Sequence, residues 1–171
     1  MRKAIAAASA LMMVAAMTGC SSGDALDREI ALGNGASLSV SSGWEQMNGA
    51  DFSEDSGFEV FKRGEGEEGI HIEWLSESSG PSPAERIENM RKSAEGDGAT
   101  EWESEIVEEK VVSGAKCTIY RYSYKIVTDK GIEDGDSYKA FIVMGNGDEV
   151  DIYGSDDLGQ LKRIVDTVTF E

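Results

Sequence analysis

Cysteine and histidine are almost absent from this sequence of 171 residues, which holds two cysteines, Cys20 and Cys117, and one histidine, His71. Zinc sites are built mainly from several such residues, so we predict no metal site of that kind. A Ser-His-Asp hydrolase would depend on His71, and no G-x-S-x-G segment presents a serine nucleophile. We therefore predict no catalytic residue and no cofactor.

Basic residues are also scarce, with 16 lysines and arginines against 33 acidic residues and a formal net charge of −17. A surface of this sign repels nucleic acid and anionic lipid headgroups, so we expect no nucleic-acid partner. The loops at 129–136, 145–151 and 154–157 concentrate acidic side chains, but none has the ligand spacing of an EF-hand. We predict ordinary turns there and no calcium site.

No apolar run reaches the roughly 20 residues that span a bilayer. The uncharged segment 4–16 (AIAAASALMMVAA) follows Arg2 and Lys3 and has the length of the apolar region of an export signal. The next four residues, Met17-Thr18-Gly19-Cys20, resemble the lipobox of bacterial lipoproteins, with Met17 where leucine is commoner.

This resemblance implies cleavage between Gly19 and Cys20 and a diacylglyceryl thioether on the Cys20 sulfur, with further acylation giving stable anchoring. We therefore predict a signal peptide over 1–19, a lipidated N-terminus and tether over 20–36, and a single domain over 37–171. The domain would face the extracytoplasmic side of the cell membrane. The alternatives are a secreted protein cleaved elsewhere and an uncleaved N-terminal helix.

Acylation of Cys20 would leave Cys117 without a partner, so we predict a domain without disulfides. Cys117 lies in a strand-like run with no histidine pattern beside it. Because a catalytic cysteine needs a base or a positive field to form its thiolate, we interpret Cys117 as a buried structural thiol.

Short strand patterns separated by turns fill most of the remaining chain. Strands are predicted near 37–40, 58–63, 69–75, 102–112, 116–127, 137–144 and 149–154. Ser82, Pro83 and Glu85 predict the start of one amphipathic helix with a capping box, and Asp156 or Asp157 caps a second. The short connections favour an α+β fold, a mainly antiparallel sheet of about six to seven strands flanked by two helices.

Three segments resemble landmarks of PsbP-like domains. They are an early strand that runs into Gly-Trp (37–45, SLSVSSGWE), an aromatic strand led by glycine (111–124) and a closing helix (161–171, LKRIVDTVTFE). Serines occupy the position before Gly-Trp where the family often has proline. The resemblance implies an α/β/α sandwich and a module that binds proteins or ligands and has no catalytic activity, although fold alone does not fix function.

Tyr120, Tyr122 and Tyr124 alternate along one predicted strand and therefore share one face of the sheet. Their rings either lie buried under a helix or loop with the hydroxyls at a wet edge, or form an aromatic platform for a glycan, a lipid headgroup or a protein. These three tyrosines are the candidate binding surface.

Taken together, the sequence predicts a lipid-anchored extracytoplasmic envelope protein that acts as a non-catalytic module. Its partners would be the membrane, through the N-terminal lipid, and an unidentified envelope protein or small ligand. One alternative is an envelope enzyme that acts on cell-wall glycans through paired carboxylates. Another is a passive surface protein without a specific ligand.

Overall fold

The computed structural model describes residues 25–171 except 48–49, 54, 63–68, 78–79 and 129–130. Cys20, the predicted signal peptide and the first part of the predicted tether lie outside the described residues. The elements are β1 (Arg28–Ala31), β2 (Ala36–Val40), β3 (Glu45–Gln46), β4 (Ala50–Ser53), β5 (Ser56–Lys62), β6 (Ile70–Leu75), α1 (Pro83–Gly96), β7 (Ala99–Val112), β8 (Ala115–Thr128), β9 (Gly131–Val143), β10 (Glu149–Ser155), α2 (Leu158–Val165) and β11 (Thr169–Phe170).

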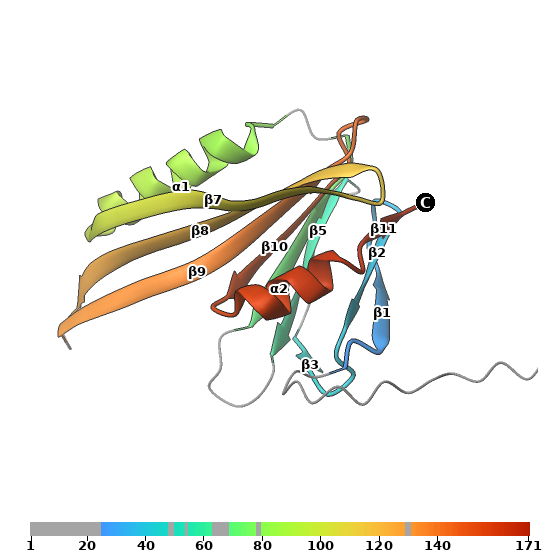
Figure 1. Ribbon diagram of the computed structural model, residues 1–171, viewed down its shortest axis with the longest axis horizontal. Coiled ribbons are helices and arrows are strands. Elements are labelled where there is room, and N and C mark those ends of the chain that lie inside the picture. Colours follow the sequence, from blue (N-terminus) through green and yellow to red (C-terminus); the bar gives the residue numbers. More distant parts are fainter. Residues whose placement is uncertain (1–24, 48–49, 54, 63–68, 78–79, 129–130) are drawn as a thin grey trace, which may run out of the picture.

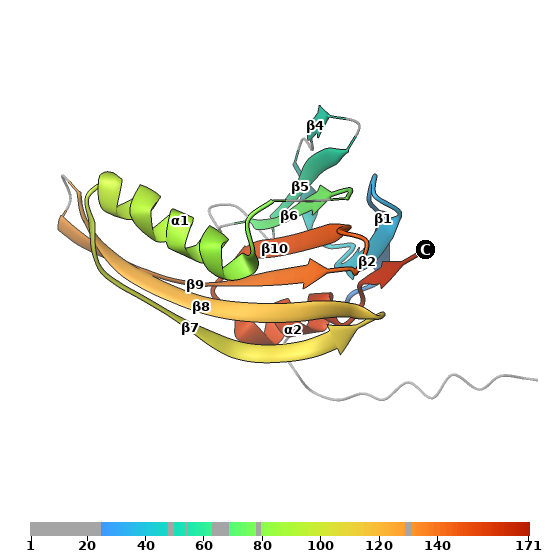
Figure 2. The same cartoon turned by 90° about the horizontal axis from the view of Figure 1, so that it is seen from above.

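A large antiparallel sheet forms the frame of the molecule, with strand order β3-β5-β6-β10-β9-β8-β7 and β4 paired to β5. Helices α1 and α2 lie on opposite faces of this sheet (Figures 1 and 2). The predicted α+β fold, an antiparallel sheet flanked by two helices, is confirmed.

A second sheet of three strands, in the order β1-β2-β11, does not follow from the sequence patterns. Strand β1 pairs with β2 in the register Arg28↔Val40, so the folded domain begins before the predicted residue 37. The prediction placed Arg28–Ala31 in the tether, because four residues with only Ile30 turned toward apolar side chains carry little strand signal. Strand β1 forms because it pairs with β2 and because Ile30 packs against the core.

Strand β9 is likewise longer than predicted, because residues 131–136, expected as a turn, continue the strand. Cross-strand contacts explain this correction: Asp136 binds Arg121, and the Thr128 hydroxyl donates a hydrogen bond to Glu133. Strands β7, β8 and β9 together project past α2 as an arm (Figure 1).

The main hydrophobic core lies between the α2 face of the large sheet, α2 and the small sheet. Of the two predicted caps, Asp157 is the one that caps α2, and Leu161, Ile164 and Val165 are buried. Cys117 is fully buried in this core, and burial raises the pKa of its thiol to about 11, which keeps the sulfur protonated and unreactive. None of the described helices is long and apolar enough to cross a membrane.

Helix α1 covers the other face and starts as predicted, with Ser82 and Glu85 forming the capping box in front of Pro83. Its apolar contact with the sheet is small. Ile87 is its one buried side chain, and it packs with Met90 against Tyr120 and Phe141. A helix held by so little apolar area needs further contacts, which polar side chains supply.

Candidate ligand-binding site beneath helix α1

The three predicted tyrosines of β8 share the α1 face but do not form one surface. Tyr120 is 8% exposed and packs edge-on against Phe141, with 5.9 Å between ring centroids. Tyr122 and Tyr124 are half-buried and both stack on Trp102, at centroid distances of 5.5 and 5.7 Å. Tyr120 therefore belongs to the region under α1, and the other two tyrosines belong to an aromatic stack further along the arm.

Trp102 enters this stack because β7 is irregular there. The register with β8 shifts between Thr100 and Glu103, and Glu101 adopts a left-handed φ of 55°. The Trp102 indole nitrogen is buried and, among the described residues, has no hydrogen-bond partner. A bulge breaks the simple alternation of a strand, which is why the sequence pattern does not place Trp102 beside the tyrosines.

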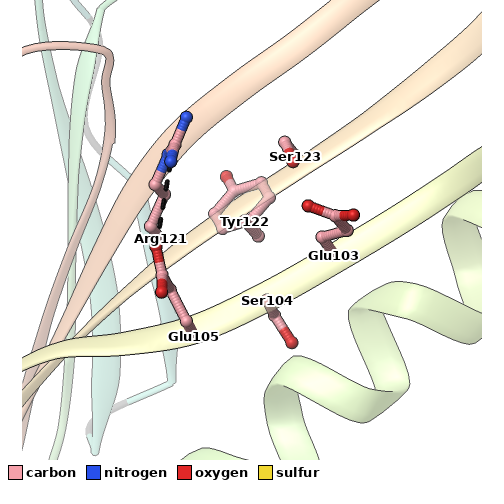
Figure 3. A pocket seen from close by; sticks show the side chains of 6 residues that line it. All are labelled: Glu103, Ser104, Glu105, Arg121, Tyr122 and Ser123. Carbon is pink, nitrogen blue, oxygen red and sulfur yellow. Dashed lines mark ion pairs between the residues drawn. The ribbon is translucent and has the colours of Figure 1, made fainter.

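A shallow hollow of about 390 Å³ lies beside Tyr122 on the arm. Figure 3 shows Arg121 and Glu105 joined on one side of the Tyr122 ring, with Glu103 on the other side. Arg121 also donates two hydrogen bonds to Asp136, which lower the pKa of that carboxyl. Because two carboxylates already hold Arg121, the hollow offers an anion little positive charge.

A larger groove, of about 620 Å³, opens at the other end of the α1 face. We call it the α1 groove, and it runs between the first turn of α1, the β7–β8 turn and the β9–β10 turn. Its lining is mostly apolar and consists of Ser82, Pro83, Ala84, Ile106, Glu109, Gly114, Lys116, Thr118, Tyr120, Phe141, Val143, Met144 and Gly145. A volume of this size is typical of sites for small ligands.

Two hydroxyl-bearing residues in the groove lining are almost fully buried, Thr118 at 5% and Tyr120 at 8% exposure. Neither hydroxyl makes a hydrogen bond to another of the described residues. Burial raises the pKa of Tyr120, so its hydroxyl stays protonated and can donate. Both oxygens reach solvent in the groove, so the two hydroxyls have hydrogen-bonding capacity at its wall.

The charged groups at the groove rim are satisfied within the protein. Lys116 forms an ion pair with Glu109 at 2.9 Å, which raises the pKa of Lys116. At the start of α1, the Glu85 carboxylate accepts hydrogen bonds from the Ser82 backbone N–H and hydroxyl, and these bonds lower the pKa of Glu85. The rim therefore presents paired charges and a capped helix end.

A charge cluster beneath α1, made of Arg86, Lys139, Glu149 and Asp151, ties the helix to the sheet. Arg86 contacts Glu149 and donates to Asp151 at 2.8 Å, and Lys139 reaches the same Asp151 oxygen at 3.0 Å. Asp151 is fully buried, and its Oδ1 has no partner among the described residues. Burial, and then the Asp151 charge, raise the pKa of Glu149 to about 7.

Aromatic rings surround the two cations of this charge cluster. The Arg86 guanidinium lies 5.1 Å from the Phe141 ring centroid, and the Lys139 ammonium lies 4.9 and 4.4 Å from the centroids of Phe141 and Tyr153. Such contacts stabilise buried cations. Among the many acidic residues of the chain, the sequence alone could not single out this pair of carboxylates.

His71 lies on β6, where its ring stacks on Tyr153 with 5.0 Å between centroids. Within the described part of the chain, no three His, Cys, Asp or Glu side chains are grouped so that they could hold a metal ion.

No protein-family model and no curated protein matches the chain. Among solved structures, it is similar to the solution structure of cyanobacterial PsbP (CyanoP) from Synechocystis sp. PCC 6803, with a TM-score of 0.56. The match covers 91% of this chain and 99% of that chain, at 11% sequence identity. Similarity at this identity concerns the fold alone. The chain therefore has a PsbP-like fold, as the three sequence landmarks predict.

Proposed function

We propose that this protein is a non-catalytic binding module and that the α1 groove is its binding site. One observation carries the proposal: the hydroxyls of Thr118 and Tyr120, which bond to no other described residue, lie together at the wall of an apolar groove of about 620 Å³. Both oxygens reach solvent in the groove. A ligand that bonds to both hydroxyls takes the place of water there and covers the apolar wall.

The alternative of a glycan-cleaving enzyme finds little support in the most buried pair of carboxylates. A glycosidase needs one carboxylic acid and one carboxylate facing an open cleft. Glu149 and Asp151 instead bind Arg86, and Asp151 binds Lys139 as well, beneath α1. These contacts suit a structural role, the attachment of α1 to the sheet.

The groove-binding proposal is tested by filling the groove. In the full chain purified from its native envelope, we expect Val143→Trp to remove a small molecule or partner that co-purifies with the wild type. Val127→Trp, at a position that is 69% exposed on the arm, is the matched control and should keep it. Native mass spectrometry identifies what is bound.

Recovery of the same co-purifying molecule or partner in equal amounts with Val143→Trp and Val127→Trp would contradict the proposal. Unfolding in urea checks that Val143→Trp still folds. If it does not, Gly145→Trp replaces it, because a Cβ added at Gly145 meets no atom within 4 Å.

We further propose that the module is held at the extracytoplasmic face of the cell membrane by lipid on Cys20. The order of basic residues, apolar segment and lipobox in the sequence supports this proposal. Since the chain is strongly acidic, the membrane contact must come from the acyl chains.

Cys20→Ala is expected to release the protein from the membrane fraction, because the acyl chains have no other attachment point. Membranes are washed at high salt before immunoblotting, so that ionic adsorption does not count as anchoring. Retention of the variant in washed membranes would show that the anchor lies elsewhere.

A further inference from the structure

From the chemistry of the groove we infer that its ligand is an uncharged, largely apolar small molecule with one oxygen that hydrogen-bonds to Thr118 and Tyr120. This inference rests on the proposed function and adds the class of ligand. It depends on three properties of the α1 groove: its volume, its charge and its hydroxyls.

The volume sets the size of the occupant. Sites of about 300–1,000 Å³ enclose small ligands, and the groove has about 620 Å³. Ile106, Val143 and Met144 form the accessible apolar wall, and Tyr120 and Phe141, 8% and 0% exposed, lie behind it. This wall offers apolar contact to an aromatic or branched ligand and offers a polymeric glycan little hydrogen bonding.

The charge pattern excludes an ionic ligand. Lys116 forms an ion pair with Glu109, and the capping box occupies the N-terminus of α1, so among the described residues of the lining an anion finds no positive group that is not already engaged. Arg86 and Lys139 bind buried carboxylates beneath the helix. A charged ligand would lose its hydration without a partner, which is costly, whereas an uncharged ligand would not.

The hydroxyls define the polar part of the ligand. A threonine or tyrosine hydroxyl both donates and accepts, so a hydroxyl or carbonyl oxygen on the ligand can bond to either. Thr118 and Tyr120 are alternate residues of β8 on the same face, so both hydroxyls can be reached from one side. The ligand oxygen would lie at this wall with its apolar body toward Ile106 and Met144.

The test uses the full chain in lipid nanodiscs with ¹³C-labelled methionine methyl groups and three matched probes. These are 1-naphthol, naphthalene and 1-naphthoate. Met144 lines the groove and reports binding, and Met47, which follows β3 at the opposite edge of the sheet, is an internal control. We expect 1-naphthol to shift the Met144 signal saturably and to leave Met47 unchanged.

Two comparisons measure the ligand class. 1-Naphthol should bind at least about tenfold more tightly than 1-naphthoate, because the carboxylate has no free cation to meet. It should bind about fivefold to tenfold more tightly than naphthalene, through the hydrogen bonds of its oxygen. The double variant Thr118→Val, Tyr120→Phe should abolish the preference for 1-naphthol over naphthalene. Thr100→Val, at an exposed site of β7, should preserve this preference.

Equal or tighter binding of 1-naphthoate would overturn the inference, and so would equal shifts of Met144 and Met47, which would indicate partition into lipid. If no probe moves Met144 but Val143→Trp still removes a co-purifying molecule, the ligand class is wrong and the proposed function stands. If 1-naphthol binds as expected but nothing co-purifies in a Val143-dependent way, the proposed function fails, and the inference that rests on it fails as well.

Discussion

Under the proposed function, the Thr118 hydroxyl serves binding and adds little to stability. Thr118 is 5% exposed, its hydroxyl lies at the wall of the α1 groove, and no other described residue bonds to it. The valine side chain has nearly the same shape and no polar atom. In the empty protein, the hydroxyl therefore contributes little stabilisation that valine would not.

We predict that Thr118→Val leaves the free energy of unfolding unchanged or raises it by up to about 1 kcal/mol. Urea unfolding of the ligand-free protein measures this change, with Thr100→Val as the exposed control. A loss of more than about 1 kcal/mol would mean that the Thr118 hydroxyl has a partner inside the protein and is not available to a ligand.

The three tyrosines of β8 show which features of the site the sequence predicts and which it does not. The alternation of Tyr120, Tyr122 and Tyr124 correctly places them on one face, but their different surroundings depend on distant elements. Tyr120 is covered because Ile87 and Met90 of α1 reach it, and Tyr124 lies so close to Gly135 that an added Cβ would be 2.6 Å from its ring. The alternating pattern of β8 predicts neither contact.

Helix α1 is attached to the sheet as much by charge as by apolar packing. Its single buried apolar residue, Ile87, is supplemented by Arg86, which binds Glu149 and Asp151 on β10. Two opposing effects act on Glu149: burial and the neighbouring Asp151 disfavour its charged form, and Arg86 favours it. The raised pKa, about 7, indicates that burial and Asp151 outweigh Arg86.

This balance predicts a pH effect that Glu149→Gln should remove. Between the unfolded pKa of 4.5 and the folded value of about 7, the folded protein binds more protons than the unfolded one. The contribution of Glu149 to stability therefore falls as pH rises through this window, by at most about 1.4 kcal/mol per pH unit.

The measurement is urea unfolding of wild type and Glu149→Gln between pH 5 and 7.5. The difference in unfolding free energy should shift in favour of the variant as pH rises. Glu88→Gln, at an exposed ion pair with Arg91 that lowers the pKa of Glu88, should show no such trend. A shift in favour of the wild type would mean that Arg86 dominates over burial.

Elements with strong local signals were the ones that sequence predicted well. The capping box of α1 and the Asp157 cap of α2 fix both helix starts within a few residues. Strand β1 and the first half of β9 depend on pairing with strands elsewhere in the chain, so their own residues indicate only a tether and a turn. The residues of a short segment do not predict its pairing with a strand that is distant in the sequence.

At the scale of the whole molecule, the early start of β1 brings the domain nearer to its proposed anchor. The chain from Cys20 to Arg28 spans at most about 30 Å when fully extended. The domain would therefore stay close to the membrane surface, where uncharged apolar molecules concentrate. A groove for such molecules and the proposed lipid anchor are consistent with one another, and the acidic surface would keep the rest of the domain away from anionic headgroups.

The most direct measurement of the central claim is site-specific photo-crosslinking in intact cells, followed by mass spectrometry of the purified protein. A photoreactive residue at Ile106, half-exposed at the groove, is compared with one at Val127, exposed on the arm. A binding groove predicts a discrete adduct at Ile106 that is lost on adding Val143→Trp, and no such adduct at Val127. The absence of an adduct at Ile106, or the same adducts at both positions, would contradict the account.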